Sequence, residues 1–540
     1  MKNQQQGDRL SWGDSVFLNL EREGMPLNVG SVSLLEGKIS FADCLQFVES
    51  KLPLIPRYLK RVVAAPLNIG LPSWDYDPEF DLRNHVRQVT LKHGTDAELK
   101  ALAGKLFGKV MDRQHPLWDL TLVHGLKGNR TGLIVRMHHC MVDGIAGVGI
   151  MSALLDESPL APRLPRRKLR LRIPTPRRAA ASLVDGFASS YSNFVERLLA
   201  AWADVLNIAE RTVANGGGNL VPQEFNNLLP EITATTERLR FNVIYRGPQK
   251  FAWTEIPLAE VKAIRQTCGT SVNDVLLALV TATVRRYAEM HGDQVKGKLF
   301  RIMVPVNLRS TDGPGQLGNC ISLVPVTIPL DIRPPKKLLA AVHKRTEFLK
   351  RAHAAELVSL AGGLVGMFPS PLQAFAGPMI SRVPFTPFNM VCTNVPGPQF
   401  PLYLLGHKML RWYPYVPVGG ELTVNCAILS YDGMVYFGFS GDVHAAPDLG
   451  RLEKLLKQNF VELRDAAGVP APRKKVERKK RVHARTQDRS KSQAASEPIS
   501  KPATTVRLAI PLPAPGPLLQ PGAAADSAVK EEKRLAQLSA

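Results

Sequence analysis

The 540-residue sequence lacks the features of a secreted or membrane-spanning protein. Its six cysteines stand singly, with no CxxC pair, so the sequence indicates neither a disulfide framework nor a cysteine-rich metal site. Residues Met1 to Trp12 are polar and lack an apolar signal-peptide core, and no apolar run reaches the roughly 18 residues of a membrane span. We therefore expect a cytoplasmic protein with reduced thiols.

Two further absences narrow the chemistry. No GxSxG string is present, and Cys140 has no separate base beside it in the sequence, so neither a serine nor a cysteine nucleophile is indicated. No aromatic residue follows Phe460, which leaves the C-terminal region without side chains that stack on bases. Nucleic-acid binding is therefore disfavoured despite the net charge of +22.

That positive charge is concentrated in two short segments. Residues 163–178 contribute +8 and residues 470–540 contribute +9, which leaves +5 for the rest of the chain. Both segments are proline-rich, so we interpret the first as an exposed linker and the second as a disordered tail. They predict attachment to an anionic membrane or lipid-droplet surface, with a solvated tail that only aids solubility as the alternative.

The remaining sequence alternates strand and helix patterns, which predicts a layered α/β fold. Helices are expected at 10–20, 41–51, 96–107, 179–213 and 271–290, and strands at 29–35, 81–89, 132–137 and 300–306. We divide the chain into an N-terminal domain (1–162), a basic linker with a bridging helix (163–235), a C-terminal domain (236–469) and a basic, Pro/Ala-rich tail (470–540).

The stretch from Met137 to Gly147 carries the most chemical information. It contains His138, His139, Asp143 and Gly144 in an HHxxxDG string directly after the apolar strand. An oriented imidazole can take a proton from a hydroxyl and return it to a leaving group. Glycine at 144 keeps the approach open for a bulky substrate. The string therefore predicts a general-base histidine.

Three other interpretations of this string remain open from the residues alone. Either histidine can be a hydrogen-bonded core residue, and His138 fits that description better, because neighbouring side chains alternate across a strand end. Asp143 can hold the loop or cap a helix rather than act as an acid. Zinc binding is disfavoured because HHxxxD lacks an i, i+4 histidine pair and no other ligand cluster completes a shell.

The string resembles the active-site motif of the wax ester synthase/acyl-CoA:diacylglycerol acyltransferase family, a group of CoA-dependent acyltransferases related to chloramphenicol acetyltransferase and condensation domains. Other motifs occur in the family's order across about residues 8–465. They are Leu10-Ser11-Trp12-Gly13-Asp14 with Phe17-Leu18 and Glu21, Asn28-Val29-Gly30, His115-Pro116-Leu117-Trp118, Val272-Asn273-Asp274-Val275, Pro305-Val306-Asn307-Leu308-Arg309, Gly318-Asn319, Asn394-Val395-Pro396-Gly397-Pro398 and Ser430-Tyr431-Asp432-Gly433.

The resemblance implies two chloramphenicol-acetyltransferase-like layered α/β domains with the active site at their interface. It implies that His139 is the general base and His138 a supporting neighbour, with Asp143 structural and paired with an arginine. Gly144 would give room to the CoA arm. Asn273 would orient or stabilise the reacting groups, for example as an oxyanion donor.

The resemblance leaves the role of one motif open and gives two other residues a structural role. Pro116, Leu117 and Trp118 either pack in the core or line the acyl channel, and Arg309 and Asn394 hold loops rather than touch substrate. The resemblance implies no cofactor. Acyl-CoA is consumed in the reaction and is therefore a co-substrate.

The expected activity is transfer of a long-chain acyl group from acyl-CoA to diacylglycerol or a long-chain alcohol in a ternary complex. A related acyltransferase with another alcohol acceptor or a carrier-bound donor is one alternative. A non-catalytic protein that binds lipid surfaces is the other.

Overall fold

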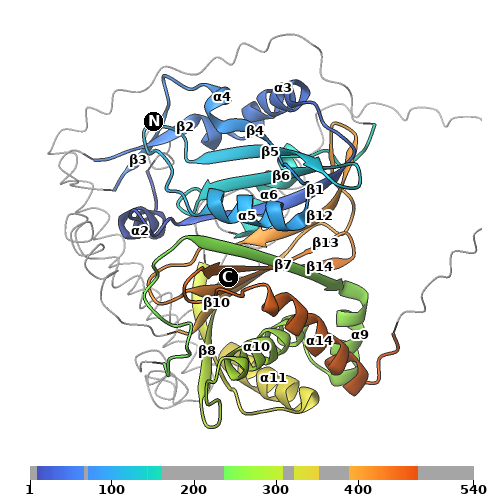
Figure 1. Ribbon diagram of the computed structural model, residues 1–540. Coiled ribbons are helices and arrows are strands. Elements are labelled where there is room, and N and C mark those ends of the chain that lie inside the picture. Colours follow the sequence, from blue (N-terminus) through green and yellow to red (C-terminus); the bar gives the residue numbers. More distant parts are fainter. Residues whose placement is uncertain are drawn as a thin grey trace, which may run out of the picture. The chain divides into compact units, whose positions relative to one another are not determined.

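The structure is a computed structural model that describes residues 9–65, 71–142, 144–160, 236–307, 321–351 and 388–471. The expected helix at 179–213, the linker 163–178 and nearly all of the tail lie outside these residues. Within them, two six-stranded sheets and the helices packed on them form a mixed α/β fold (Figure 1).

The first sheet has the strand order β11-β12-β1-β6-β5-β4. Its strands are antiparallel except for the parallel pair β4 and β5. In chain order they are β1 (Asn28–Glu36), β4 (Val86–Thr90), β5 (Trp118–Leu126), β6 (Arg130–His138), β11 (Tyr403–Leu404) and β12 (His407–Tyr415), with a separate two-stranded ribbon of β2 (Lys60–Val63) and β3 (Ser73–Tyr76).

The second sheet has the order β7-β14-β13-β10-β8-β9, and β10 runs parallel to both of its neighbours. Parallel strands need long connections: the chain between β8 and β10 contains β9 and the helix Pro335–Arg351, and the chain between β10 and β13 contains β11 and β12. The strands are β7 (Gln249–Pro257), β8 (Leu299–Asn307), β9 (Ile321–Pro329), β10 (Met390–Pro396), β13 (Val424–Tyr431) and β14 (Met434–Asp442).

Of the described helices, four pack on the second sheet, and one bridges the two sheets. α9, α10, α11 and α14 pack with one another and on the second sheet, whereas α5 contacts strands of both sheets (Figure 1). The helices are α2 (Trp12–Leu20), α3 (Phe41–Lys51), α4 (Leu82–His85), α5 (Asp96–Phe107), α6 (Gly144–Leu154), α9 (Leu258–Cys268), α10 (Val272–Met290), α11 (Pro335–Arg351) and α14 (Arg451–Ala466), with short 3₁₀ turns at Leu52–Leu54 and Pro56–Leu59.

Local sequence sets several of these boundaries. Ser11, Thr95 and Ser271 are N-caps of α2, α5 and α10, each in a capping box with the acidic residue three positions later. The predicted helices at 41–51 and 96–107 have the observed limits, which confirms those predictions.

The predicted strand at 81–89 is wrong in its first half. Asp81 accepts a hydrogen bond from Arg83 N–H and begins one helical turn, α4, before β4 starts at Val86. A single capped turn is too short to show a helical period in sequence, which is why it was missed.

The first sheet is completed by residues from far along the chain. β12 pairs with β1 in the register Gly30 to Tyr415, so residues 403–415, which fall in the range predicted for the C-terminal domain, lie in the sheet that holds β6. At Gly30 a Cβ atom would lie 2.1 Å from the Val135 carbonyl oxygen and 2.8 Å from the Phe107 ring. Glycine is therefore needed for this packing. The residue limits of the domains stay a prediction.

An aromatic cluster joins β12 to α5 and to the second sheet. The ring of Tyr415 stacks on Phe107 with centroids 3.8 Å apart, and Tyr413 stacks on Trp253 at 4.9 Å. Phe251 meets Phe107 edge to face. Because Trp253 and Phe251 lie on β7, the core of the first sheet is continuous with side chains of the second.

Candidate active site

Both motif histidines lie at the end of β6, where the backbone is tied on two sides. β6 lies between β1 and β5 in the first sheet. The His138 N–H donates to the Leu117 carbonyl and the His139 N–H to the Leu27 carbonyl, both at 2.9 Å. These bonds fix where each ring leaves the strand.

The His138 ring is fully buried, at 0% exposure. Its Nδ1 accepts a hydrogen bond from the Cys140 N–H at 3.0 Å, and its Nε2 lies 3.3 Å from Oε1 of Glu21. An acceptor Nδ1 assigns the proton of a neutral imidazole to Nε2, where it faces the carboxylate. His138 therefore has no lone pair available to take a proton from a substrate.

Glu21 is a buried carboxylate with several partners. Oε1 accepts the Leu27 N–H at 3.1 Å, and Oε2 pairs with Arg113 at 3.1 Å. Burial acts to raise the pKa of Glu21, but His138, the Leu27 N–H and Arg113 outweigh it and hold that pKa below its ordinary value. Glu21 is therefore ionised at neutral pH beside the His138 ring.

The His139 ring is only half-buried and has a different neighbour. Phe17 stacks on it with ring centroids 3.9 Å apart and planes 4° from parallel. A face-to-face stack fixes the ring plane and leaves the edges that carry the nitrogens clear of the Phe17 ring. Of the two histidine side chains, that of His138 is fully buried, whereas that of His139 is partly exposed.

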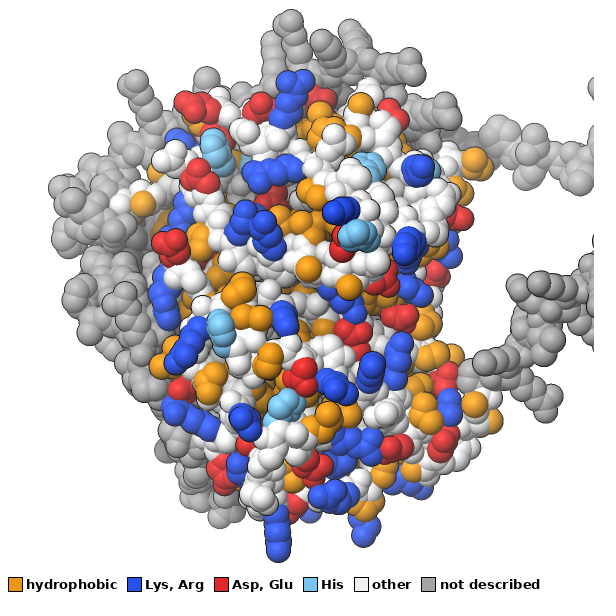
Figure 2. All heavy atoms as spheres, in the orientation of Figure 1, with side chains coloured by type: hydrophobic (Ala, Val, Ile, Leu, Met, Phe, Trp, Pro, Cys, Tyr) orange, Lys and Arg blue, Asp and Glu red, His pale blue; other side chains and the backbone are white. Residues whose placement is uncertain are grey.

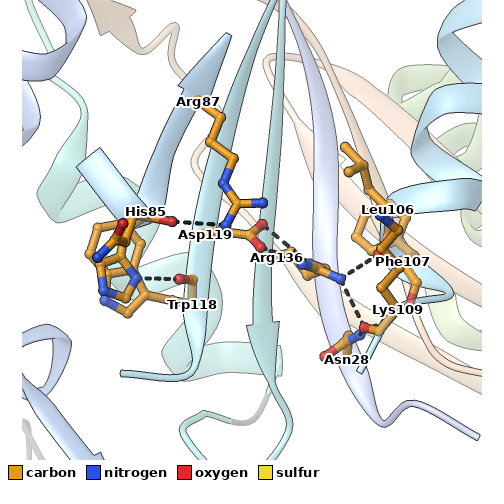
Figure 3. Close-up of polar contacts among 10 residues, drawn as sticks. Asn28, His85, Arg87, Leu106, Phe107, Lys109, Trp118, Asp119 and Arg136 are labelled. Carbon is orange, nitrogen blue, oxygen red and sulfur yellow. Dashed lines mark hydrogen bonds and ion pairs between the residues drawn. The ribbon is translucent and has the colours of Figure 1, made fainter. Parts of the chain in front are cut away.

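A buried arginine earlier on the same strand ties β6 to α5 (Figure 3). Arg136, two residues before His138 on the same face of β6, pairs with Asp119 of β5 and donates to the carbonyl oxygens of Leu106 and Lys109, the latter at 2.8 Å. Asn28 of β1 donates to the same Lys109 carbonyl at 2.7 Å. These contacts satisfy the end of α5 and hold β1, β5 and β6 together.

The motif Pro116-Leu117-Trp118 lies in the core of the first sheet. Leu117 is fully buried, and the Trp118 indole N–H donates to the Tyr58 carbonyl at 2.8 Å. Trp118 is stacked between the rings of Tyr58 and His85. These contacts favour the packing role of the motif, and its role in lining an acyl channel stays a prediction.

Asn273 lies in the first turn of α10 and is half-buried. Its Oδ1 accepts a hydrogen bond at 3.2 Å from Nδ2 of Asn394 on β10. This bond assigns the side-chain orientation, because the acceptor end of Asn273 is turned to Asn394 and its NH₂ group points elsewhere. β10 also contacts α6, the helix that follows the histidine motif, so Asn394 connects the two motifs through adjacent elements.

Asp274 holds this turn in place. It accepts hydrogen bonds from the Ser271 N–H at 2.8 Å, Thr346 Oγ1 at 2.7 Å and His343 Nδ1 at 2.9 Å. Burial alone would raise its pKa, but these donors lower it below the ordinary value. Asp274 therefore ties α10 to α11 as an ionised cap.

Replacing Asp274 should destabilise the protein in a pH-dependent way. We expect Asp274→Ala to lower the free energy of unfolding by about 2–4 kcal/mol at pH 7, and Ser271→Ala by about 1 kcal/mol. A carboxyl whose pKa is lower in the folded than in the unfolded protein stabilises the folded state at pH values above its unfolded-state pKa. This stabilisation is lost as the pH falls through its folded-state pKa. Urea unfolding should be measured for the wild type and Asp274→Asn at pH 7 and in acid. We expect the difference in their free energies of unfolding to become smaller in acid. A difference that becomes larger in acid contradicts this role of Asp274.

Several predicted residues cannot be placed. Asp143, Arg309, Gly318 and Asn319 lie outside the described residues, so the pairing of Asp143 with an arginine stays a prediction. Gly144, the last residue of the HHxxxDG string, is the first residue of α6.

Sequence reasoning did not assign roles to Glu21, Phe17 and Arg136. The spacing of Phe17 and Glu21 was a usable signal, because Glu21 follows the last residue of the first helix and lies four positions after Phe17, which brings the two side chains to one side of the helix end.

The described residues bear on two alternative roles, metal binding and membrane spanning. In the described part of the chain, no group of three or more His, Cys, Asp or Glu side chains is arranged to hold a metal ion. Over the same residues, no single helix is long and apolar enough to cross a membrane; α9 and α10 meet that criterion only as a pair bent by 102°.

Sequence comparisons match both halves of the chain. Residues 10–276 match the model of the wax ester synthase/diacylglycerol acyltransferase catalytic domain, and residues 317–464 match that of the WS/DGAT C-terminal domain. Two proteins of Mycobacterium tuberculosis, each named a probable diacylglycerol O-acyltransferase, are similar over most of the chain. One is 27% identical over 83% of this chain and 94% of its own length, and the other 26% identical over 86% and 100%.

Solved structures share the fold. A wax ester synthase/diacylglycerol acyltransferase from Marinobacter aquaeolei VT8 aligns with a TM-score of 0.58 at 24% identity, covering 85% of this chain and 100% of that one. The first condensation domain of the calcium-dependent antibiotic synthetase aligns with a TM-score of 0.53 at 15% identity, covering 86% and 96%. The predicted two-domain α/β fold is confirmed.

Proposed function

The chain belongs to the wax ester synthase/diacylglycerol acyltransferase family, and we propose that it transfers a long-chain acyl group from acyl-CoA to the hydroxyl of diacylglycerol or a long-chain alcohol. One observation carries the assignment of the base. The two histidines are differently held: His138 is buried, with Nδ1 accepting from the Cys140 N–H and Nε2 3.3 Å from Glu21 Oε1, whereas His139 is half-buried and stacked on Phe17.

The reaction needs a base because a neutral hydroxyl is a weak nucleophile. His139 takes the hydroxyl proton as the oxygen attacks the thioester carbonyl of acyl-CoA, and a tetrahedral intermediate forms. When this intermediate collapses, the carbon–sulfur bond breaks and the imidazolium returns the proton to the CoA thiolate. The products are an ester and free CoA, and His139 is neutral again.

The negative charge on the intermediate needs a hydrogen-bond donor. The NH₂ group of Asn273 is suited to this task, because its Oδ1 is occupied by Asn394. A donor already oriented before the reaction stabilises the oxyanion without reorganisation. Asp274 and its partners on α11 would keep that turn of α10 in register.

A covalent acyl-enzyme on the motif cysteine is disfavoured. Cys140 is fully buried, and burial raises the pKa of its thiol well above the ordinary value, with the charges of Asp14 and Glu21 adding to the effect. The reactive form of cysteine is the thiolate, which this environment suppresses. Direct transfer in a ternary complex is the mechanism that these residues support.

A CoA-release assay tests the activity and separates it from the alternatives. Purified protein is incubated with palmitoyl-CoA and either dioleoylglycerol or hexadecanol, and free thiol is measured together with the ester product. We expect CoA release that depends on the acceptor. Release with neither acceptor but with another alcohol favours the related acyltransferase, and vesicle binding without any release favours a non-catalytic lipid-surface protein.

We further propose that the protein attaches to anionic lipid surfaces, since its substrates dissolve in lipid. The support is the charge distribution: residues 163–178 and 470–540 carry +8 and +9 of the net +22. On the described surface, by contrast, acidic and basic side chains are intermixed on the face drawn in Figure 2. Clustered cations attract anionic headgroups by about 1 kcal/mol per residue near the surface.

Deletion of the residues after Val469 should separate attachment from turnover. We expect unchanged CoA release with detergent-dispersed substrates, weaker co-sedimentation with vesicles containing phosphatidylserine, and residual binding that falls as salt rises. Vesicle binding that is unaltered by the truncation across the salt series would assign the tail to solubility instead.

A further inference from the structure

We propose that the C-terminal end of α2 positions the histidine pair, with Glu21 holding His138 and Phe17 holding His139. Both are positioning residues, since they act through the histidines. The proposal rests on the proposed acyl transfer for its kinetic consequences, but the contacts themselves stand independently of it.

Helix α2 presents the two side chains to the histidines from adjacent positions. Glu21 is the C-cap of α2 and lies four positions after Phe17, the spacing that places side chains one above the other at a helix end. The Glu21 N–H donates to the Phe17 carbonyl at 3.1 Å, and Glu21 then leaves the helix with extended backbone angles. At the other end, the Ser11–Asp14 capping box fixes where α2 begins.

Glu21 reaches the His138 ring directly. Because the Cys140 N–H occupies Nδ1 of His138, the ring proton lies on Nε2, 3.3 Å from Glu21 Oε1. A carboxylate at this distance favours the Nε2-protonated tautomer and opposes rotation of the ring. The two contacts hold opposite sides of the imidazole.

Glu21 also reaches the His139 backbone through one residue. The Leu27 N–H donates to Glu21 Oε1 at 3.1 Å, and the Leu27 carbonyl accepts the His139 N–H at 2.9 Å. The same carboxylate oxygen thus fixes the His138 ring and the strand segment that anchors His139. Movement of this oxygen would shift both histidines.

Phe17 sets the plane of the catalytic imidazole. With centroids 3.9 Å apart and an interplanar angle of 4°, the rings are in close face-to-face contact. The face of an aromatic ring also favours a cation over a neutral partner. Phe17 therefore restricts the His139 ring and favours the imidazolium that forms when the substrate hydroxyl is deprotonated.

The chain offers matched controls for both contacts. Asp77 is a buried carboxylate whose Oδ2 lies 3.0 Å from Nδ1 of His115, and Phe80 is a partly buried ring stacked on His85 at 5.1 Å. Both pairs lie in the same half of the protein as Glu21 and Phe17. Asp77→Asn and Phe80→Leu therefore make the same chemical changes at contacts with other histidines, His115 and His85, and not with His138 or His139.

The kinetic experiment compares these variants in the full-length protein. Since displacement of a catalytic group by about 1 Å costs up to 10²-fold, we expect kcat to fall about 10-fold in Glu21→Gln and Phe17→Leu and about 100-fold in Glu21→Ala. KM for palmitoyl-CoA should stay within about 2-fold, as the proposal requires of residues that act through the histidines and not on substrate. Asp77→Asn and Phe80→Leu should keep wild-type kcat even where they lower Tm.

A second measurement does not depend on activity. Ring-¹⁵N-labelled histidine distinguishes the two neutral tautomers, and the His138 signal is assigned by its loss in His138→Ala. We expect the Nε2-protonated form in the wild type and a changed His138 signal in Glu21→Ala and not in Asp77→Asn. If the wild type transfers no acyl group, the proposed function fails while this measurement still decides the positioning role.

Three results overturn the proposal. One is a raised KM with unchanged kcat in the Glu21 variants, which would make Glu21 a substrate contact. Another is equal kcat for Phe17→Leu and Phe80→Leu. The third is a His138 signal in Glu21→Ala identical to that of the wild type. Should Glu21→Ala fail to fold, the isosteric Glu21→Gln decides the kinetic and NMR comparisons.

Discussion

Replacing His139 with alanine is expected to lower kcat for CoA release by about 10²–10⁴-fold, the range that general-base catalysis contributes. The reason is that His138 cannot substitute for it, since its Nδ1 accepts from Cys140 and its Nε2 faces Glu21. Thermal unfolding should change little, because the His139 ring is half-buried and borders Phe17. CoA release measured with a free-thiol reagent gives the result.

Two comparisons make this result specific. Added imidazole should restore part of the activity of His139→Ala and leave the wild type unchanged, because a small base can enter the space left by the ring. His138→Ala should retain more activity than His139→Ala while losing more stability, since it empties a buried site and leaves the Glu21 carboxylate without its partner. Full activity in His139→Ala, or complete loss in both variants at unchanged Tm, contradicts the assignment of the base.

Asn273→Asp is expected to lower kcat by about 10²–10³-fold, the cost of removing one oxyanion donor. The aspartate keeps an oxygen that can accept from Asn394 Nδ2, so the local structure is retained, but the NH₂ group is replaced by a negatively charged oxygen. That charge would repel the developing oxyanion. Steady-state kinetics should show the loss in kcat with little change in KM.

A matched control exists on α14. Asn459 is a buried asparagine whose Nδ2 donates to Thr283 Oγ1 of α10 at 3.1 Å. Asn459→Asp therefore changes the same chemical group in a contact between two helices. It should lower stability and leave kcat unchanged. If both asparagine variants lose activity in proportion to their loss of Tm, Asn273 has a structural role and the oxyanion donor must be sought elsewhere.

The sequence by itself determined the elements that depend on neighbouring residues. The helices at 41–51 and 96–107 follow from apolar spacing and from the caps Ser40 and Thr95. The histidine motif after an apolar strand, together with the motifs in their order, was enough to predict the family. Such features are local, because hydrogen-bond caps and helical periods involve residues three or four positions apart.

The tertiary structure decided how the site is built. Alternation along β6 indicated that only one of the two histidines could face a given side. The neighbours of each ring, however, are Glu21 and Phe17, which lie more than 100 positions earlier in the chain. Likewise, the pairing of Gly30 with Tyr415 and the bond between Asn273 and Asn394 join segments far apart in sequence. Contacts of this kind form only when the whole chain packs, because their energy comes from the burial and register of distant elements, which no local pattern specifies.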